Sequence, residues 1–420
     1  MQETITGDDA HYAYDIVKTI CDEVGPGVPG SSQERERAAV IQRELESHLG
    51  SGQVVMEEFT LAPGASLSSY PISGWFMLLA ALLNVTIGRF AGVSPLVTSA
   101  AALAFSIASP LLFILEFIFG FEFIDPLFKK QQSVNVIGTL RKPGAKNVKR
   151  LLMLSGHHDS APENTWLRLL GYGMFVLSAT FSIGLIVMAA MSAIQLTGVI
   201  SGNADIVRAG TLGWVLLAYP IAPSVGFALL FTRRGKDGGT VPGAADNLSA
   251  SALAVAMCRF LVQHPTYIPE NTEIRFISFG SEEAGLRGSR RYVERHLDEL
   301  RRLDARLLNF ETVVHPEITV LSSDVNGTVK NSPEMVQSAV AAAQRAGVAF
   351  KVRAATIGVG TDAAPFNRAG LKATTLLPFH VPQQLVAFYH QRRDTPDVLT
   401  IQPLMNVLKL ALEWIRTGGQ

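Results

Sequence analysis

The sequence predicts an α/β fold in which helices sandwich a mixed, mainly parallel sheet, with two transmembrane helical hairpins inserted into it. Three observations lead to this prediction. Short apolar runs suited to buried strands alternate with helical patterns, as they do in parallel sheets. Four much longer apolar runs interrupt that alternation. The chain has 420 residues, which is enough for one large core or two ordinary domains.

The composition excludes several classes of protein. Acidic and basic residues balance at 36 each, so no net field favours nucleic acid as a partner. Charged residues make up 17% of the chain, against about a quarter in typical soluble domains, and the mean hydropathy is positive. Only Cys21 and Cys258 occur, which excludes a disulfide scaffold and a cysteine-based metal site. The first nine residues lack the basic and apolar regions of a signal peptide, so we expect insertion through internal segments.

The N-terminal part predicts two helices and a strand pair. Apolar spacing over residues 9–24 suits a helix. We expect Ser32 to cap a second helix over 33–48, which carries Glu and Arg on its outer face and ends near Gly50. A strand over 53–61 is expected to pair with a strand over 133–140.

The four long apolar runs predict two membrane hairpins. A run of about 18 or more apolar residues is long enough to cross the bilayer core as a helix. Buried core helices are the alternative, but they are usually shorter and carry a polar stripe, which these runs lack. The runs cover residues 74–93, 96–121, 167–194 and 211–231. The expected division is hairpin 1 at 73–128, hairpin 2 at 164–232, and one further domain made of 1–72, 129–163 and 233–420.

Basic residues near these runs are concentrated on one side. The side shared with the remaining domain carries Lys129, Lys130, Lys149, Arg150, Arg168, Arg233, Arg234 and Lys236. The opposite turns carry only Arg89 and Arg208. The positive-inside rule therefore predicts a cytoplasmic domain and four transmembrane helices. The alternative is that some of these bases belong to the surface of the domain.

After the first hairpin, the α/β pattern resumes. Buried strands are expected over 150–156 and 271–280, with a helix over 248–262 between them. Further strands are expected at 307–310, 318–321 and 373–377, and further helices at 333–346 and 401–417. Because binding sites of such sheets lie beyond the carboxyl ends of the strands, polar side chains at these ends are candidate site residues.

Five side chains of metal-ligand type follow these strands or sharp turns. Two zinc ions that lie close together repel each other unless a carboxylate bridges them, and Asp246 on its Gly-containing turn is the candidate bridge. His157 and His390, each with an acid, would complete two zinc sites. Of Glu282 and Glu283, one would bind metal while the other takes a proton from water.

Each residue also has a structural interpretation. Asp159, two residues after His157, is placed to hold the second N–H of that imidazole. Taken alone, His157 or His158 would be a hydrogen-bonded core histidine, and Glu282 with Glu283 a solvated turn. Asp246-Asn247 could be a helix cap and His390 a surface residue, and we interpret His380 as structural. The joint occurrence of acids and histidines at successive strand ends favours the metal site.

In their order along the chain, these motifs resemble metallopeptidase family twenty-eight. This family comprises co-catalytic di-zinc aminopeptidases related to glutamate carboxypeptidase and, more distantly, to glutaminyl cyclase. The matching motifs are His157-His158-Asp159, Gly243-Ala244-Ala245-Asp246-Asn247, Glu282-Glu283-Ala284-Gly285-Leu286-Arg287-Gly288-Ser289, Asn309-Phe310-Glu311, and His390 with Asp394-Thr395-Pro396-Asp397. Segments 27–32 and 361–366 are also similar to the family, so the resemblance spans the whole part outside the hairpins.

The resemblance implies the phosphorylase/hydrolase-like fold of zinc exopeptidases and two zinc ions per chain. Its ligand set would place His157 and Glu311 on one zinc, Glu283 and His390 on the other, and Asp246 between them. Glu282 would be the general base and Asp159 would support His157. Glu311 is a departure, because the family usually has Asp there.

The implied function is a membrane-anchored exopeptidase that hydrolyses peptides or protein termini, with removal of N-terminal residues expected. Two alternatives stay open: a single-zinc, cyclase-type acyltransferase, and a non-catalytic membrane receptor or scaffold that retains the fold. The presence of both His157 and His390 argues against the first alternative. The complete ligand set together with Glu282 argues against the second.

Overall fold

The computed structural model describes residues 4–87, 92–142, 144, 147–230, 239–356 and 358–420, and of residues 214–220 only the backbone. The chain forms two compact units. The sheet unit comprises Met1–Pro63, Asp125–Glu163 and Gly239–Gln420, and the helical unit comprises Gly64–Ile124 and Asn164–Gly238. The expected domain boundary between residues 232 and 233 lies outside the described residues.

The sheet unit is built on an eight-stranded sheet. Its strands, in spatial order, are β1 (Val54–Leu61), β2 (Gln131–Arg141), β4 (Thr272–Phe279), β3 (Arg150–His157), β5 (Arg306–Phe310), β10 (Lys372–Leu377), β6 (Ile318–Leu321) and β9 (Phe350–Arg353). The four central strands β4, β3, β5 and β10 are parallel, whereas β2 and β6 run antiparallel to β4 and β10. The predicted mixed, mainly parallel sheet is therefore confirmed. So is the predicted pairing of the strand at 53–61, since β1 pairs antiparallel with β2.

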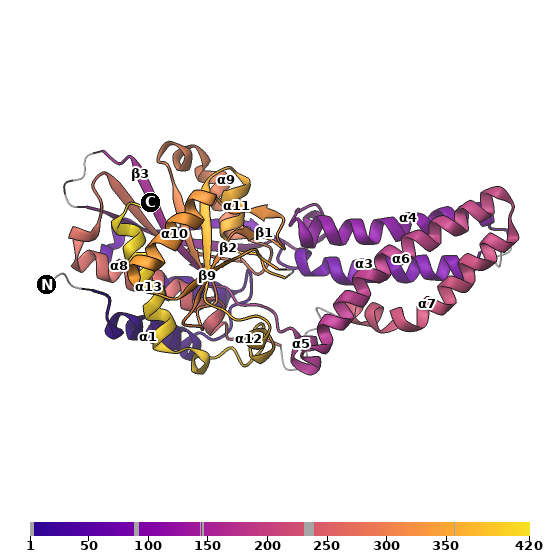
Figure 1. The fold of residues 1–420 in the computed structure, drawn as a ribbon, viewed down its shortest axis with the longest axis horizontal. Coiled ribbons are helices and arrows are strands. Elements are labelled where there is room, and N and C mark those ends of the chain that lie inside the picture. The colour runs from indigo at the N-terminus through magenta and orange to yellow at the C-terminus, as the bar shows by residue number, and fades with distance from the viewer. Residues whose placement is uncertain (1–3, 88–91, 143, 145–146, 231–238, 357) are drawn as a thin grey trace. The chain divides into compact units, whose positions relative to one another are not determined.

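Alternating side chains of the central strands supply two separate cores. On β3, Leu152 and Leu154 belong to one buried cluster and Leu151 and Met153 to another, as expected for a strand covered on both faces. Figure 1 shows helices α1, α8, α10 and α13 around the sheet. The helices of this unit are α1 (Gly7–Glu23), α2 (Ser32–Leu49), α8 (Ser249–Gln263), α9 (Arg287–Arg302), α10 (Pro333–Ala346), α11 (Ala363–Arg368), α12 (Gln383–Ala387) and α13 (Ile401–Arg416).

The two cores identify which helices cover which face. Residues of α1, α2, α8, α10 and α13 share the cluster that contains Leu152 and Leu154. Residues of α9 and α11 share the cluster that contains Leu151 and Met153. The sheet is thus sandwiched by helices, as predicted. The remaining short elements are the helical turns Ser51–Gln53, Asp125–Leu127, Ala244–Leu248, Pro265–Tyr267 and Pro396–Val398, and the strand pair β7 (Ser323–Asp324) and β8 (Val329–Lys330).

One expectation about α2 was wrong and another holds only in part, since other Glu and Arg side chains of this helix, such as Arg35, are exposed as expected. Its N-cap is Ser31, whose hydroxyl accepts a hydrogen bond from the backbone N–H of Glu34, so Ser32 is already the first helical residue. Glu34 and Arg37 do not lie on the outer face either, because both side chains are buried. Buried charges are tolerated only when their hydrogen bonds are satisfied, and both residues find partners near the carboxyl edge of the sheet.

The helical unit is a bundle of long apolar helices. Figure 1 shows α3, α4, α6 and α7 running alongside one another. Glycines give space for close packing between these helices, since a Cβ on Gly184 would lie 2.7 Å from the Met77 side chain and one on Gly198 would lie 2.9 Å from the Val207 backbone nitrogen. The helices are α3 (Ala65–Val85), α4 (Pro95–Phe113), α5 (Thr165–Leu170), α6 (Gly173–Ser201) and α7 (Ala204–Leu230), and the segment Ile114–Ile118 continues α4 as a π-helical turn.

Buried polar side chains also connect these helices. The amide of Asn84 donates to the Ser192 hydroxyl at 2.7 Å, and the Ser106 hydroxyl donates to the same oxygen at 2.7 Å. The amide of Gln195 donates to the Thr211 hydroxyl at 3.0 Å. Residues from α3, α4, α6 and α7 therefore meet in one polar layer, and such interhelical hydrogen bonds hold apolar helices in register.

Helix length and composition bear on the predicted membrane segments. Four helices within the described residues are long and apolar enough to cross a bilayer: Ala65–Val85, Pro95–Ile118, Gly173–Ser201 and Ala244–Gln263. The last is 89% buried in the sheet unit, whereas the other three are 22–33% buried, so only those three have free apolar surface for lipid. Lipid exposure is what separates a membrane helix from a core helix. The fourth predicted run, 211–231, falls in α7, where Ile221–Leu230 is a shorter apolar stretch.

The bounds of the first predicted run were wrong. The run is predicted at 74–93, whereas helix α3 begins at Ala65 and ends at Val85. The helix begins earlier because the polar segment from Ser66 to Tyr70 is also helical. Of the basic residues used to predict orientation, Arg89, Arg233, Arg234 and Lys236 lie outside the described residues.

Candidate metal centre

Parallel pairing aligns the carboxyl ends of three strands. His157, the last residue of β3, pairs with Phe279, the last residue of β4, and β4 is followed by the turn that carries Glu282 and Glu283. β5 runs parallel to β3 and ends at Phe310, directly before Glu311. Strand register therefore brings side chains that are up to 154 positions apart in the chain (157 and 311) to one edge of the sheet.

Three carboxylates surround the Nε2 atom of His157. Asp246 Oδ1 lies 3.4 Å from this nitrogen, and Glu282 Oε2 and Glu311 Oε1 each lie 3.7 Å from it. The His157 side chain is 1% exposed. The longer side chain of Glu311 thus reaches the same nitrogen as Asp246 does, although the family usually has Asp at this position.

His390 meets the other side of the same aspartate. Its Nε2 lies 3.0 Å from Asp246 Oδ2 and 3.1 Å from Glu283 Oε1. Asp246 therefore directs one carboxylate oxygen towards each histidine. The His390 side chain is 24% exposed, so this side of the cluster is open to solvent while the His157 side is closed.

The donor set fits divalent metal. The candidate ligand atoms of His157, Asp246 and Glu311 lie within 4.8 Å of one another, and so do those of Asp246, Glu283 and His390. Asp246 Oδ2, Glu283 Oε1, Glu311 Oε2 and His390 Nε2 are buried without a hydrogen-bond partner. Imidazole and carboxylate are the ligands that zinc uses, and buried atoms without partners are what a bound cation would satisfy.

The protonation of the cluster leads to the same conclusion. Burial and the neighbouring carboxylates raise the pKa of Glu311 to about 8, and the pKa of Glu283 is also raised by burial. Burial raises the pKa of Glu282 well above its usual range, although the nearby His157 opposes this effect. Several carboxylates crowded in a buried site cannot all ionise unless a cation compensates them.

Asp159 connects the histidine to the glutamate pair. Its Oδ1 lies 3.3 Å from His157 Nδ1, on the opposite side of the ring from the cluster. The same carboxylate accepts hydrogen bonds from the backbone N–H groups of Glu282 and Glu283, both at 3.0 Å. Asp159 therefore orients the imidazole and also holds the turn that carries the two glutamates.

Sequence reasoning missed two residues that hold the cluster together. The carboxylate of Asp394 accepts hydrogen bonds from the N–H groups of Ala245 and Asp246, at 2.7 and 3.1 Å. The side chain of Asn247 donates to the Phe310 carbonyl and accepts from the Thr312 N–H, both at 3.1 Å, which ties the Glu311 turn to the Asp246 turn. Both residues stand inside the quoted motifs, but their partners are distant in sequence.

Two further residues that hold the cluster together, Glu34 and Arg37, come from α2. Glu34 accepts hydrogen bonds from the N–H and the hydroxyl of Ser281, directly before Glu282. The guanidinium of Arg37 donates to the carbonyls of His158 and Pro242, and so connects the His157 segment to the Asp246 segment. Their charged side chains on an otherwise amphipathic helix carried no signal that distinguished them from surface residues.

His158 is placed apart from the candidate ligands. Its Nδ1 is 2.9 Å from the Ser278 hydroxyl, and its side chain is fully buried. Burial lowers its pKa to about 4, so the imidazole is neutral at ordinary pH. It belongs to none of the candidate metal groups among the described residues.

An ion pair between an exposed arginine and a buried glutamate joins the segment of His390 to the segment that follows His157. Arg392 donates from Nε to Glu163 Oε1 and from Nη2 to Glu163 Oε2, both at 2.8 Å. The Glu163 side chain is 1% exposed, and its backbone N–H donates to the Gly239 carbonyl at 2.9 Å. Through its side chain and its backbone, Glu163 therefore connects the three segments that carry His157, Asp246 and His390.

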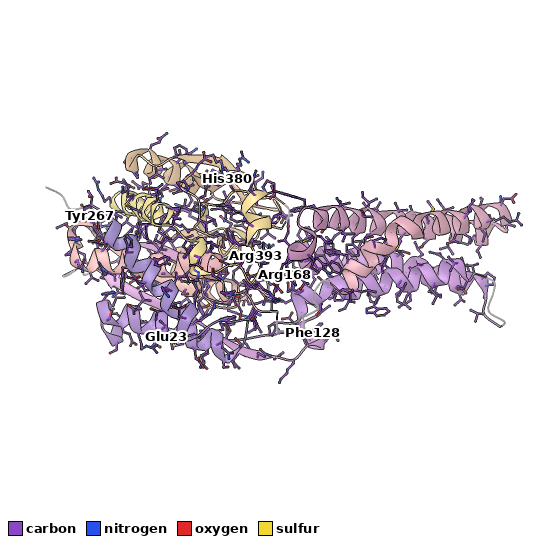
Figure 2. All side chains as sticks on the ribbon, turned by 90° about the horizontal axis from the view of Figure 1, so that it is seen from below. Glu23, Phe128, Arg168, Tyr267, His380 and Arg393 are labelled. Atoms are coloured by element: carbon purple, nitrogen blue, oxygen red, sulfur yellow. The ribbon has the colours of Figure 1, made fainter. Side chains whose placement is uncertain are left out.

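We expect Arg392→Gln to lower the metal affinity of the His390 side about tenfold, the scale on which partners behind the ligands affect a metal site. The physical reason is that glutamine cannot form the two parallel N–H···O bonds that hold the His390 segment. Metal content after dialysis against graded chelator measures the effect. Arg393→Gln is the matched control, because Arg393 is an exposed neighbour (labelled in Figure 2), and equal losses in both variants would contradict the prediction.

The chain is similar in sequence to known peptidases. The sequence profile of peptidase family M28 matches residues 225–415. Over 167 residues, or 39% of the chain, the sequence is 34% identical to aminopeptidase YwaD of Bacillus subtilis strain 168. The chain covers 35% of the length of that curated relative.

Three solved structures are similar over nearly their whole length. BSAP, a zinc aminopeptidase from Bacillus subtilis, has a TM-score of 0.53 at 17% identity, covering 96% of this chain and 93% of that one. A glutaminyl cyclase from an Acidobacteriales bacterium has a TM-score of 0.55 at 15% identity, covering 100% and 98%. A leucine aminopeptidase precursor from Bacteroides thetaiotaomicron has a TM-score of 0.55 at 16% identity, covering 99% and 98%. At these identities the likeness establishes a shared fold, the one predicted from the motifs.

Proposed function

We propose that the chain is a member of peptidase family M28, whose profile matches residues 225–415, and that it is a membrane-anchored di-zinc exopeptidase that removes N-terminal residues from peptides or proteins. The observation that carries this proposal is the position of Asp246, which directs Oδ1 towards His157 and Oδ2 towards His390. A carboxylate shared in this way is what two adjacent cations require. The proposed ligands are His157 and Glu311 for one zinc and Glu283 and His390 for the other, with Asp246 common to both.

Zinc ions held by these residues would polarise the scissile carbonyl and lower the pKa of an attacking water. Glu282 is the proposed general base, with Oε2 taking a proton from that water and returning it to the departing amine. Burial raises the pKa of Glu282 in the cluster by itself. Adjacent cations would lower this pKa, so that the carboxylate would be ionised and able to accept the proton. Asp159 supports the reaction indirectly by orienting His157 and the Glu282 backbone.

The proposal that the chain acts at the N-terminus of its substrates rests on the names of two similar proteins. YwaD and BSAP are both aminopeptidases by name. Glutaminyl cyclases share the fold, so fold alone does not decide the reaction. The proposal of two metal ions favours hydrolysis, because both histidines and all three proposed acidic ligands are present.

We expect the purified, zinc-loaded chain to shorten peptides from the N-terminus, and to stop doing so when a chelator removes its metal. Digestion of a peptide library followed by mass spectrometry reports which end is trimmed. Peptides with a blocked N-terminus are the matched control and should stay intact. Trimming from the C-terminus, or cyclisation of N-terminal glutamine with one metal per chain, would contradict the proposal.

We further propose that the helical unit anchors the chain in a lipid bilayer with the sheet unit in the cytoplasm. The support comes from three long apolar helices with free surface, and from the excess of basic residues on the side of the sheet unit. The close glycine contacts and the polar layer of Asn84 and Ser192 are features that membrane bundles use.

Cysteine labelling tests this orientation. In a Cys21→Ser background, we expect Ser201→Cys, at the exposed end of α6, to react with an impermeant maleimide in intact cells. The reason is that an even number of crossings places this turn on the side opposite the sheet unit. Ser51→Cys, exposed on the sheet unit, is the control and should react only after permeabilisation. The reverse pattern would show that the sheet unit lies outside the cytoplasm.

A further inference from the structure

A second group of metal-ligand side chains lies at the edge of the sheet, among residues outside the proposed zinc centre. One ligand atom each from His315, Glu317 and His380 lies within 4.8 Å of the others. His380 Nε2 is 3.3 Å from Glu317 Oε2. The rings of His315 and His380 stack at a centroid distance of 3.9 Å, so one ring would rotate about its side-chain bonds for both imidazoles to face one ion. All three side chains are partly exposed, so a metal ion could enter from solvent and keep water as a further ligand.

Strand register builds this group. Thr319 of β6 pairs with Lys351 of β9 on one side and with Leu377 of β10 on the other. Glu317 precedes Thr319 by two residues, and His380 follows Leu377 by three, so both approach Lys351 at the same end of β6. The His315 N–H donates to the Pro378 carbonyl at 2.8 Å, which fixes the two segments against each other. The group is therefore held by backbone pairing rather than by chance surface contacts.

The same position already holds a cationic side chain. The ammonium of Lys351 contacts Glu317 Oε2 and lies 2.8 Å from His380 Nε2. Lys351 also keeps the pKa of the Glu317 carboxyl below its usual range, so this ligand is ionised at neutral pH. A partly exposed ion pair of this kind contributes little to stability, and a divalent cation with three ligands would compete with it.

We propose that His315, Glu317 and His380 form a second, peripheral site for zinc or another divalent metal that prefers imidazole, with Lys351 as the competing cation. Two imidazoles and one carboxylate are a ligand set that zinc uses when it keeps an open position. This site is separate from the proposed zinc centre, and its existence does not depend on peptidase activity.

The peripheral site lies close in sequence to two of the proposed zinc ligands, Glu311 and His390. His315 follows Glu311 by four residues, and His380 precedes His390 by ten. The rings of Phe379 and Tyr389 lie 5.5 Å apart, and Tyr389 stacks on His390 at 4.0 Å. An ion bound between His315 and His380 would therefore restrain both segments that carry proposed ligands. Figure 2 labels His380 and Arg393, which border the second of these segments.

The test counts zinc bound by the full-length, zinc-loaded protein during equilibrium dialysis at rising free zinc. We expect wild type to bind one zinc more per chain than His380→Gln. His11→Ala, which removes an exposed histidine from α1, is the matched control and should bind as wild type does. Equal zinc counts for wild type and His380→Gln would overturn the proposal. Failure of the zinc centre would lower both counts equally, so the difference between them still decides.

Lys351→Met provides an independent test, because it should tighten metal binding whereas misfolding would weaken it. Removing a positive charge adjacent to a bound divalent cation should tighten the peripheral site by about tenfold. Unchanged or weaker binding by Lys351→Met would overturn the proposal. Hydrogen exchange supplies a third measurement: zinc should slow amide exchange over 311–318 and 378–390 in wild type but not in His380→Gln, and equal slowing in both would also overturn it.

Discussion

Glu282→Gln should reduce peptide hydrolysis by about 10²–10⁴-fold, the range that a general base contributes, while leaving zinc content unchanged. Glutamine keeps the size of the side chain but cannot accept a proton. Glu282 Oε2 lies 3.7 Å from His157 Nε2 and is not in the proposed ligand set. The measurements are single-turnover cleavage of a peptide and metal analysis of the same sample.

Glu283→Gln is the matched comparison for this experiment. Glu283 Oε1 lies 3.1 Å from His390 Nε2, so its replacement should lower zinc content together with activity. The two neighbouring variants therefore separate proton transfer from metal binding. If Glu282→Gln lost zinc while Glu283→Gln kept it, the roles of the two glutamates would have to be exchanged. Such an exchange is geometrically possible, because ligand atoms of His157, Glu282 and Glu283 also lie within 4.8 Å of one another.

Asp246→Asn should weaken the binding of both metal ions by more than about 100-fold, which is the upper end for partners that only support a ligand. The amide has the same shape but one neutral oxygen, and it places an N–H₂ group opposite either His157 or His390. Activity should fall with metal content. Zinc analysis after gel filtration, with peptide cleavage on the same fractions, measures both.

The control for this variant is Asp15→Asn, an exposed substitution of the same chemistry on α1, which should leave zinc content unchanged. Thermal unfolding of the metal-free proteins distinguishes lost binding from lost folding. Loss of a single zinc ion in Asp246→Asn, with the other held as tightly as in wild type, would contradict a carboxylate shared by both sites.

Most of the sheet unit could be predicted from local patterns. Strand β3 carries the apolar run Leu151–Leu154 because it is buried on both faces, and α10 begins at Pro333 after a Ser332 cap. Errors arose where polar residues serve the interior. Glu34 and Arg37 have the composition of a solvent-facing helix surface, yet their hydrogen-bond partners on distant segments bury them.

The candidate ligands were predictable because their motifs are short and each stands next to a strand end or turn. The residues that hold them were less so: Asp394 acts through the backbone of Ala245 and Asp246, and Arg392 through Glu163. Their partners lie 148–149 and 229 positions away in the chain. No local pattern encodes a hydrogen bond of that separation, because the pairing depends on how the sheet brings loops together.

By itself, the sequence determined the α/β class, the apolar helices and the identity of the candidate ligands, since periodicity, run length and motif spacing are local properties of the chain. Only the tertiary structure decided that Asp246 directs one oxygen to each histidine, that Glu34 and Arg37 are buried, and that His380 lies beside His315 and Glu317. These three facts depend on strand order and register, which bring distant segments within a few ångströms of one another.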